Sequence, residues 1–147
     1  MILEPGRYLI DESIYLLTTV IAIKNIFGIR SIFVDAGVNI LPSAYYRKHK
    51  IKALTYKSPK KELVDLYGPL CMQVDILESG IMLPKVDVGD ILMILTTGAY
   101  ELSHSIQFIR TRPAVVCMDK EKVFLIRRKE TLKDITLQDC WEVIENE

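Results

Sequence analysis

Cys71 is the residue whose type and setting could most directly do chemistry. It lies in the stretch Tyr67-Gly-Pro-Leu-Cys71-Met-Gln-Val-Asp75, directly after a Gly-Pro pair. Gly and Pro define a turn, so the thiol is held at one position instead of floating in a loop. This setting makes Cys71 a candidate catalytic group. The alternative is a small buried hydrophobe, which is how free cysteines usually behave.

Three other polar groups stand beside turn residues or at the ends of apolar stretches. Glu4-Pro-Gly-Arg7 sets an acid and a guanidinium across a rigid turn. The planar guanidinium suits a carboxylate or phosphate, and a buried Glu can pair with a pyridinium nitrogen. Tyr100, in Gly98-Ala-Tyr100, could bind a phosphate oxygen, and Asp35 could contact a substrate amine. The structural alternatives are a surface ion pair, an aromatic cap on the core and loop hydrogen bonding, respectively.

The charge balance excludes several classes of partner. Lys plus Arg and Asp plus Glu each number 19, so nothing indicates nucleic acid or an acidic membrane. The basic run Arg47–Lys50 is interpreted as a solvated loop face, because no aromatic stacking pattern accompanies it. The apolar stretch 14–29 contains Lys24 and Asn25 and falls short of a membrane span of about 20 residues.

Cysteine and histidine usage indicates neither a disulfide framework nor a metal site. The three cysteines are scattered, at Cys71, Cys117 and Cys140, and the two histidines, His49 and His104, stand alone. The chain begins with no secretory signal pattern. We therefore expect a cytoplasmic protein without a bound metal.

The positioning elements are predicted to be short strands. Stretches rich in Ile, Val, Thr and Tyr separated by turn residues are typical of strands. They cover 8–24, 29–35, 51–56, 61–66, 72–77, 91–95, 114–118 and 122–127. The strand at 91–95 is nearly all apolar and is expected to be buried on both faces, 83–90 reads as a polar connector, and 132–144 as a terminal helix or extended tail. Many short strands without an internal boundary predict an all-β sandwich or barrel.

The ordered motifs resemble a known family. Their order is Glu4-Pro-Gly-Arg7, Val34-Asp-Ala-Gly, Gly68-Pro with Cys71 and Asp75, Gly98-Ala-Tyr100, and Arg127-Arg-Lys-Glu-Thr131. Over residues 3 to about 135 this order resembles the C-terminal portion of the fold-type III pyridoxal-phosphate decarboxylases, which act on diaminopimelate, ornithine or arginine. The similarity is greatest to diaminopimelate decarboxylase.

The resemblance implies a fold and a domain division. It implies a mainly β, Greek-key-like barrel or sandwich, similar to the C-terminal domain of alanine racemase, with one or two short helices. Residues 1–7 would end a pyridoxal-phosphate-binding (β/α)8 barrel that is otherwise absent, and residues 8–147 would form the C-terminal β-barrel domain. The Schiff-base lysine of the family lies in the barrel, so we do not expect it in this chain.

The resemblance also implies roles for five residues. Cys71 matches the thiol that donates a proton to the substrate carbon after carbon dioxide leaves. Glu4 matches the acid that pairs with the pyridine nitrogen of pyridoxal 5′-phosphate. Gly6 and Arg7 match positions near the cofactor phosphate and the substrate carboxylate, and Tyr100 matches a phenol that contacts the phosphate. The cofactor supplies the difficult chemistry, and the protein supplies placement and electrostatics.

Two departures from the family pattern concern the substrate. The family has an acidic residue after the cysteine, where it binds the distal amine of the substrate, and this chain has Met72. Diaminopimelate-type members carry Arg-Pro between the positions of Asn39 and Tyr46, and this chain has Ile-Leu-Pro-Ser. With Arg7 and Asp35, Met72 is therefore expected to line a site for a less polar or carrier-bound amino acid.

The expected function is that of the C-terminal domain of a pyridoxal-phosphate-dependent amino-acid decarboxylase. It would supply the proton-donor cysteine and a homodimer interface, and it would be inactive without the barrel, as a domain or a subunit. The alternative is a non-catalytic β-barrel that serves as a pairing or regulatory module. An apolar content of 50% suits either, because both bury surface against partners.

Overall fold

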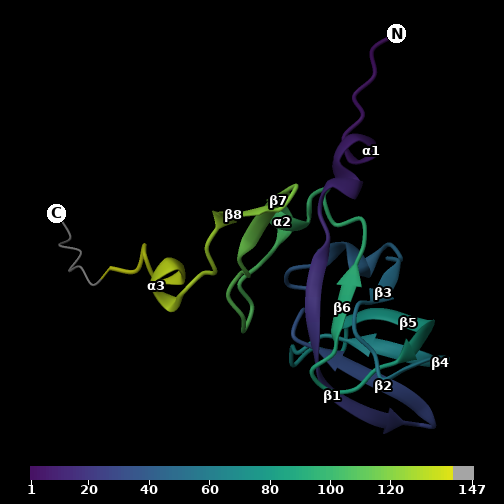
Figure 1. Ribbon diagram of the computed structural model, residues 1–147. Helices are drawn as coiled ribbons and strands as arrows, with labels where there is room; N and C mark the ends of the chain where they lie inside the picture. The colour runs from purple at the N-terminus through teal and green to yellow at the C-terminus, as the bar shows by residue number, and fades with distance from the viewer. Residues whose placement is uncertain (141–147) are drawn as a thin grey trace, which may run out of the picture. The chain divides into compact units, whose positions relative to one another are not determined.

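The structure is a computed structural model that describes residues 1–140. It divides into two compact units, residues 1–106 and the part from residue 107 onward. The sequence signals no boundary at this point. The first unit contains the six-stranded sheet and all the predicted site residues (Figure 1).

The first unit is a strongly curved, mostly antiparallel sheet. Its strands are β1 (Leu16–Ile26), β2 (Ile29–Val34), β3 (Ile51–Ala53), β4 (Ser58–Tyr67), β5 (Ile76–Lys85) and β6 (Ile91–Ile94). They are ordered β3-β6-β1-β2-β4-β5. The two edge strands, β3 and β5, approach each other, so the sheet nearly closes into a barrel. The prediction of a mainly β, barrel-like fold with short helices is confirmed.

One neighbouring pair, β2 and β4, is parallel. A parallel pair needs a crossover connection, because a tight hairpin reverses the chain direction and can therefore join only antiparallel strands. Residues 35–57 make this crossover, and they contain the 3-10 helix η2 (Pro42–Tyr45) as well as β3. The crossover therefore carries Tyr46 and Arg47 away from the sheet, toward the N-terminal segment.

The hydrophobic core lies inside the curved sheet. Alternate residues of each strand face inward, as the period of two requires. Fully buried members of this set are Val20, Ile32, Val34, Val64, Leu66, Leu77, Leu92 and Ile94. Each buried Leu or Ile contributes about 1.5–3 kcal/mol relative to an exposed one.

The N-terminal segment is helical where a strand was predicted. Residues 8–24 were expected to be extended, but α1 (Arg7–Ile10) and η1 (Asp11–Ser13) precede β1. Local polar bonds stabilise this turn: Arg7 pairs with Asp11 one turn later, and the Ser13 hydroxyl donates to the Ile10 carbonyl at 2.6 Å. The β-branched composition was therefore overridden by side-chain bonds in the first residues.

Three further expectations about the strands are wrong. Residues 72–75 are not extended, because the Asp75 carboxylate binds backbone N–H groups and delays β5 until Ile76. Residues 83–85 belong to β5 and not to a connector. In β6, Leu92 and Ile94 are buried, but Ile91 is 38% exposed, so one face of this strand is open. The short helix α2 (Glu101–His104) was not expected.

The second unit is a hairpin followed by a short helix. Strands β7 (Val115–Asp119) and β8 (Lys122–Arg127) pair antiparallel, as predicted. Helix α3 (Leu132–Ile135) covers only the start of the predicted 132–144 element, whose last four residues lie outside the described part of the chain. Thr131 and Asp134 form a capping box at its N-terminus. Within residues 1–140, no helix has the length and apolar character needed to traverse a bilayer.

Candidate functional site

Gly6, Arg7 and Tyr100 meet on the surface of the first unit. The Tyr100 hydroxyl lies against the Gly6 backbone so closely that a Cβ at position 6 would collide with it. The Arg7 guanidinium carbon is 5.3 Å from the centroid of the Tyr100 ring, within cation–π range. The Tyr100 ring also stacks on His104, with centroids 5.8 Å apart. The structure thus brings together three site residues from opposite ends of the unit.

Tyr100 is held in an uncommon backbone conformation. Its φ of 73° is in the left-handed region, which non-glycine residues rarely adopt. The next residue, Glu101, is buried, and its Oε2 accepts a hydrogen bond from the Ser43 N–H at 3.2 Å. This hydrogen bond connects α2 to η2, and it helps to hold Tyr100 in its left-handed conformation. Such strained residues cluster at functional sites.

An ion cluster beside Tyr100 has more positive than negative charge. Asp11 pairs with Arg7 at 3.1 Å and with Arg47 at 2.8 Å, so two guanidinium groups share one carboxylate. Arg7 also donates to the Tyr46 hydroxyl at 3.3 Å. Because one positive charge is left over, the cluster suits an anionic group such as a phosphate or carboxylate.

The loop of Cys71 is exposed but fixed. Cys71 is exposed and unpaired to another cysteine, so it is not the buried hydrophobe of the alternative interpretation. Asp75 fixes the loop: its carboxylate accepts the N–H groups of Leu70 at 2.7 Å and Val38 at 2.8 Å. Its own backbone carbonyl accepts the Gly68 N–H at 2.9 Å. The thiol is therefore presented to the outside from a pinned loop.

Burial raises the pKa of the Asp75 carboxyl above its usual value of 3.8, and the bonds from Val38 and Leu70 oppose this rise. Because the folded-state pKa is raised, the stability linked to this proton is fully present below pH 3.8. It is lost as the pH rises through the folded-state value. At neutral pH the ionised Asp75 carboxylate therefore carries a desolvation cost, which the hydrogen bonds from Val38 and Leu70 partly offset.

We expect Asp75→Asn to lower the free energy of unfolding by about 2 kcal/mol. Each carboxylate oxygen of Asp75 accepts one buried N–H group, and in the variant the amide NH2 would replace one of these acceptors and leave that N–H without a partner. The substitution should also remove the pH-dependent component described above. Urea unfolding at pH 4 and pH 7 measures both effects. The matched control is Asp87→Asn, whose partner Lys57 forms an exposed ion pair at 3.0 Å. Equal losses in the two variants would contradict the assignment.

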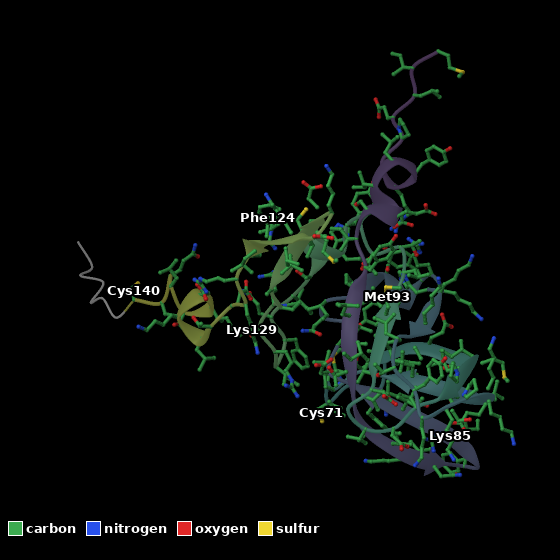
Figure 2. The ribbon with its side chains drawn as sticks, in the orientation of Figure 1. Cys71, Lys85, Met93, Phe124, Lys129 and Cys140 are labelled. Atoms are coloured by element: carbon green, nitrogen blue, oxygen red, sulfur yellow. The ribbon has the colours of Figure 1, made fainter. Side chains whose placement is uncertain are left out.

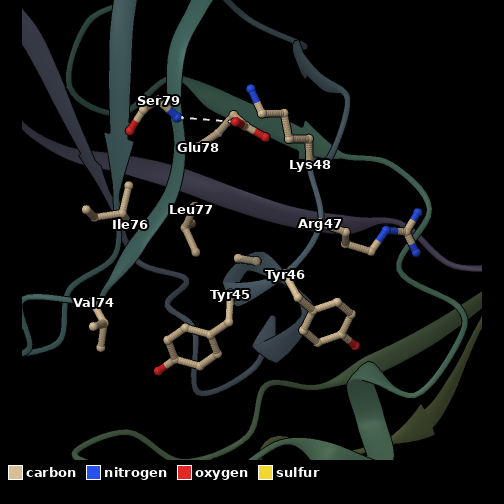
Figure 3. A pocket seen from close by; sticks show the side chains of 10 residues that line it. Tyr45, Tyr46, Arg47, Lys48, Val74, Ile76, Leu77, Glu78 and Ser79 are labelled. Carbon is tan, nitrogen blue, oxygen red and sulfur yellow. Dashed lines mark hydrogen bonds between the residues drawn. The ribbon is translucent and has the colours of Figure 1, made fainter.

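A hollow lies between the end of the Cys71 loop and the residues near Arg7. Its volume is about 560 Å³, and Val74, Ile76, Glu78, Tyr45 and Tyr46 are among its lining residues. In Figure 3 the Tyr45 ring lies on the side of Val74, and the Tyr46 ring points to the opposite side, that of Arg47. Since the Tyr46 hydroxyl also accepts the hydrogen bond from Arg7, the hollow adjoins both predicted parts of the site.

The remaining predicted residues are less connected to this cluster. Glu4 is exposed in the segment before α1, and within residues 1–140 no hydrogen bond or ion pair is formed by its side chain. Asp35 is exposed directly after β2, and its Oδ1 accepts the Thr18 hydroxyl at 2.6 Å and the Thr19 N–H at 2.8 Å. Met72 is half-buried and packs on the hydrophobic core. Their roles toward cofactor and substrate stay predictions.

The residues at Tyr100 fit one end of a phosphorylated cofactor. A phenol lies in a cradle that a Cβ at position 6 would fill, and an arginine from a cluster with excess positive charge lies over its ring. These are donors for a phosphate or a carboxylate. Among residues 1–140 no group of His, Cys, Asp and Glu has the arrangement of a metal site.

Comparison with known proteins defines the class. A sequence profile described as "Pyridoxal-dependent decarboxylase, C-terminal sheet domain" matches residues 7–98. The chain therefore belongs to the family of pyridoxal-dependent decarboxylases, within their C-terminal sheet domain. This confirms the resemblance that the ordered motifs indicate.

Within the family, the matched relatives include diaminopimelate decarboxylases. The chain is 39% identical over 142 residues to that of Methanocaldococcus jannaschii, covering 95% of this chain and 32% of the relative. It is 36% identical over 141 residues to that of Helicobacter pylori, covering 92% and 34%. The chain thus spans about a third of the length of these relatives.

Solved structures of such relatives share the fold. The crystal structure of diaminopimelate decarboxylase from M. jannaschii superposes with a TM-score of 0.87 at 37% identity, over 95% of this chain and 32% of that one. The Helicobacter pylori enzyme complexed with L-lysine superposes with a TM-score of 0.82 at 32% identity, over 92% and 34%. The mainly β fold is therefore that of the decarboxylase C-terminal domain.

Sequence reasoning missed the ion cluster around Asp11. A local signal existed for one half of it, because Arg7 and Asp11 are four residues apart, the spacing of helical ion pairs. The basic run predicts a solvated loop face for Arg47, but its guanidinium pairs with Asp11 and donates to the Thr96 hydroxyl at 3.3 Å. Its partners are brought near only by the crossover fold, so no sequence pattern could have identified them.

Proposed function

We propose that this chain acts as the C-terminal domain of a pyridoxal-phosphate-dependent amino-acid decarboxylase, with a diaminopimelate-like substrate. The observation that carries the proposal is the convergence of Gly6, Arg7 and Tyr100 in a chain that belongs to this family. The bound cofactor supplies an electron sink for the electron pair released when the carboxylate leaves. The tasks left to this chain are to position the cofactor and substrate, to bind their anionic groups, and to donate one proton.

The residues of the chain divide these tasks. Tyr100 donates its hydroxyl to the cofactor phosphate, and Gly6 leaves the space in which it lies. Arg7 binds an anionic group of the cofactor or substrate, and Glu4 pairs with the pyridine nitrogen. Cys71 gives its proton to the carbon that has lost carbon dioxide. Its exposure supports this role, because such a donor must reach a substrate held by another part of the protein.

The substrate side of the site is formed by Arg7, Asp35 and Met72. Arg7 would pair with the substrate carboxylate, as its guanidinium fork permits. Asp35 has one carboxylate oxygen engaged by Thr18 and Thr19, which leaves its second oxygen for an amine. Met72 would contact the apolar body of the substrate. Relatives named diaminopimelate decarboxylase make diaminopimelate the first substrate to assay.

A chimera tests the activity. This chain would replace the matching C-terminal third of the M. jannaschii diaminopimelate decarboxylase, and carbon dioxide release would be measured from diaminopimelate, lysine, ornithine and arginine. We expect turnover with pyridoxal phosphate, and the ranking of the substrates measures whether Met72 and Ile-Leu-Pro-Ser have shifted the preference away from diaminopimelate. A folded chimera that binds the cofactor without decarboxylating any of these would instead favour the non-catalytic pairing module.

The isolated chain is the matched control. We expect it to release no carbon dioxide, since the Schiff-base lysine of the family is expected in the barrel, as a domain or as a partner subunit. Incubation with pyridoxal phosphate followed by borohydride reduction and peptide mapping measures this directly. One specifically labelled lysine in the isolated chain would overturn this part of the proposal.

The proposed partners include a second copy of the chain. On the outer face of the sheet, Ile29, Leu63 and Met82 lie on neighbouring strands, and each is 40–54% exposed. Ser31 of β2 is paired with Lys24 of β1 on one side and with Asp65 of β4 on the other. Two copies related by a twofold axis would bury the apolar row and set Lys24 of one against Asp65 of the other.

We expect the chain to sediment as a dimer at micromolar concentration. The double variant Leu63→Lys and Met82→Lys should raise the dimer dissociation constant by about 100-fold, since it places charges in an apolar contact. The control is Lys60→Ala on the same strand, outside the apolar row. A monomer at all concentrations, or equal effects in both variants, would contradict the interface.

The cytoplasmic location stays a prediction. Its support within residues 1–140 is that the three cysteines, Cys71, Cys117 and Cys140, are all free and exposed. Exposed thiols persist in reducing compartments and pair in oxidising ones. Fractionation of cells that express a tagged chain measures the location.

A further inference from the structure

A second hollow in the first unit collects positive charge from the crossover and from β3, including Lys50 and Lys52, to which the proposed decarboxylase site assigns no role. Its volume is about 520 Å³. Four basic residues line it, Arg47, Lys48, Lys50 and Lys52, against a single carboxylate, that of Glu12. Four basic groups against one carboxylate give the lining a formal net charge of +3.

Lys50 and Lys52 are brought together by strand β3 and its pairing with β6. Lys50 precedes β3 and Lys52 lies within it, so as alternate residues they lie on one face of the strand. Ile51, between them, packs on the hydrophobic core. Lys52 is paired with Met93 across the ladder, and the Lys50 carbonyl accepts the Leu95 N–H at 2.9 Å. The hollow thus has an apolar side formed by β6, where Met93 is labelled in Figure 2.

The lysines have no counter-charge of their own. Within residues 1–140, none of Lys48, Lys50 and Lys52 forms an ion pair, whereas Lys57 pairs with Asp87 at 3.0 Å. Arg47 is the exception, because it is anchored by Asp11 at 2.8 Å and by Thr96 at 3.3 Å. Arg47 and Lys48 also line the first hollow, where Figure 3 labels both, so the two hollows share these residues, whereas Lys50 and Lys52 line only the second. One anchored guanidinium and three ammonium groups without an ion pair therefore line the second hollow, against the single carboxylate of Glu12.

We propose that this second hollow binds a small multivalent anion, a phosphate ester or a polycarboxylate. Three lysines supply point charges, Arg47 supplies a positioned fork, and Tyr15, Met93 and Leu95 accommodate a short apolar body. The ligand relieves the mutual repulsion of the cations. Because Arg47 shares Asp11 with Arg7, the site is also joined to the residues around Tyr100 through a single carboxylate.

A competing explanation is that the lysines only protect an edge strand. β3 ends the sheet, and lysines on edge strands discourage pairing with other chains. Solvated lysines of this kind respond to salt but do not select a ligand. The two explanations differ in whether an anion binds at one place with defined stoichiometry.

The test is titration of the full 147-residue chain with inorganic pyrophosphate and, separately, citrate at constant ionic strength. Calorimetry should give one site per chain, and amide shifts in NMR should concentrate at Glu12, Tyr15 and Thr96. Preference for pyrophosphate assigns a phosphate ligand, and preference for citrate assigns a polycarboxylate. Either supports the proposal, whereas shifts spread over all exposed lysines would overturn it.

Two matched double variants distinguish binding at this hollow from non-specific attraction of the anion to surface lysines. Lys50→Gln with Lys52→Gln should weaken the binding of the preferred anion by about tenfold, as expected for two lost charge contacts. Lys60→Gln with Lys61→Gln removes the same charge from exposed positions of β4 outside the hollow, and it should leave affinity within about twofold. Equal weakening in the two double variants would overturn the proposal, and thermal unfolding checks that both remain folded.

Discussion

Replacing Cys71 by Ala in the chimera should lower kcat by about 100-fold or more with little change in KM. A proton donor acts in the transition state, and positioned general acids contribute about 10²–10⁴-fold to rate. Cys71 is suited to this task by its setting: the thiol is exposed, and Asp75 pins its loop through the N–H groups of Leu70 and Val38. Steady-state kinetics of carbon dioxide release measures the effect.

Two further cysteine variants sharpen this experiment. Cys71→Ser keeps the shape of the side chain with a much weaker acid, so its kcat should lie closer to that of the alanine variant than to the parent. Cys117→Ala removes another exposed thiol, on β7, and should leave kcat unchanged. An unchanged kcat in Cys71→Ala would remove this residue from the mechanism while leaving the family assignment intact.

Gly98→Ala should have the largest effect on folding among glycine-to-alanine substitutions in this chain. A Cβ at position 98 would overlap the Ile10 carbonyl oxygen and lie 2.7 Å from the Ser13 hydroxyl. The backbone cannot easily retreat, because the Gly98 N–H donates to the Asp11 carbonyl at 2.9 Å. Overpacking against rigid backbone costs about 3 kcal/mol. We expect a drop of roughly 10 °C in melting temperature.

The same substitution should loosen the candidate site. The segment 10–13 that touches Gly98 begins at the last residue of α1, the helix that holds Arg7 against Tyr100. If that segment moves, the chimera should bind pyridoxal phosphate more weakly. The control is Gly28→Ala, which has open space around its Cβ and only the strain of φ +85°. It should cost about 1 kcal/mol and leave cofactor affinity unchanged. Equal losses of stability in the two variants would contradict close packing as the cause.

Sequence reasoning performed best where a property is local. Turn residues at Asn25–Gly28 predicted the β1–β2 hairpin, and Asp119–Glu121 predicted the β7–β8 hairpin, because turns depend on a few neighbouring dihedral angles. It failed at 8–13 and 72–75, where side-chain carboxylates bind nearby groups and override strand propensity. A propensity describes an average environment, and these segments have particular hydrogen-bond partners.

The sequence by itself determined the family, the mainly β class and a short set of candidate residues, since ordered motifs and strand-length apolar stretches are written along the chain. Only the tertiary structure decided which candidates meet. It joined Arg7 to Tyr100, gave Asp11 two arginines and left Cys71 exposed on a pinned loop. It also turned a run of lysines into the wall of a hollow. The reason is physical: contacts between distant residues depend on the crossover between β2 and β4 and on the curvature of the sheet.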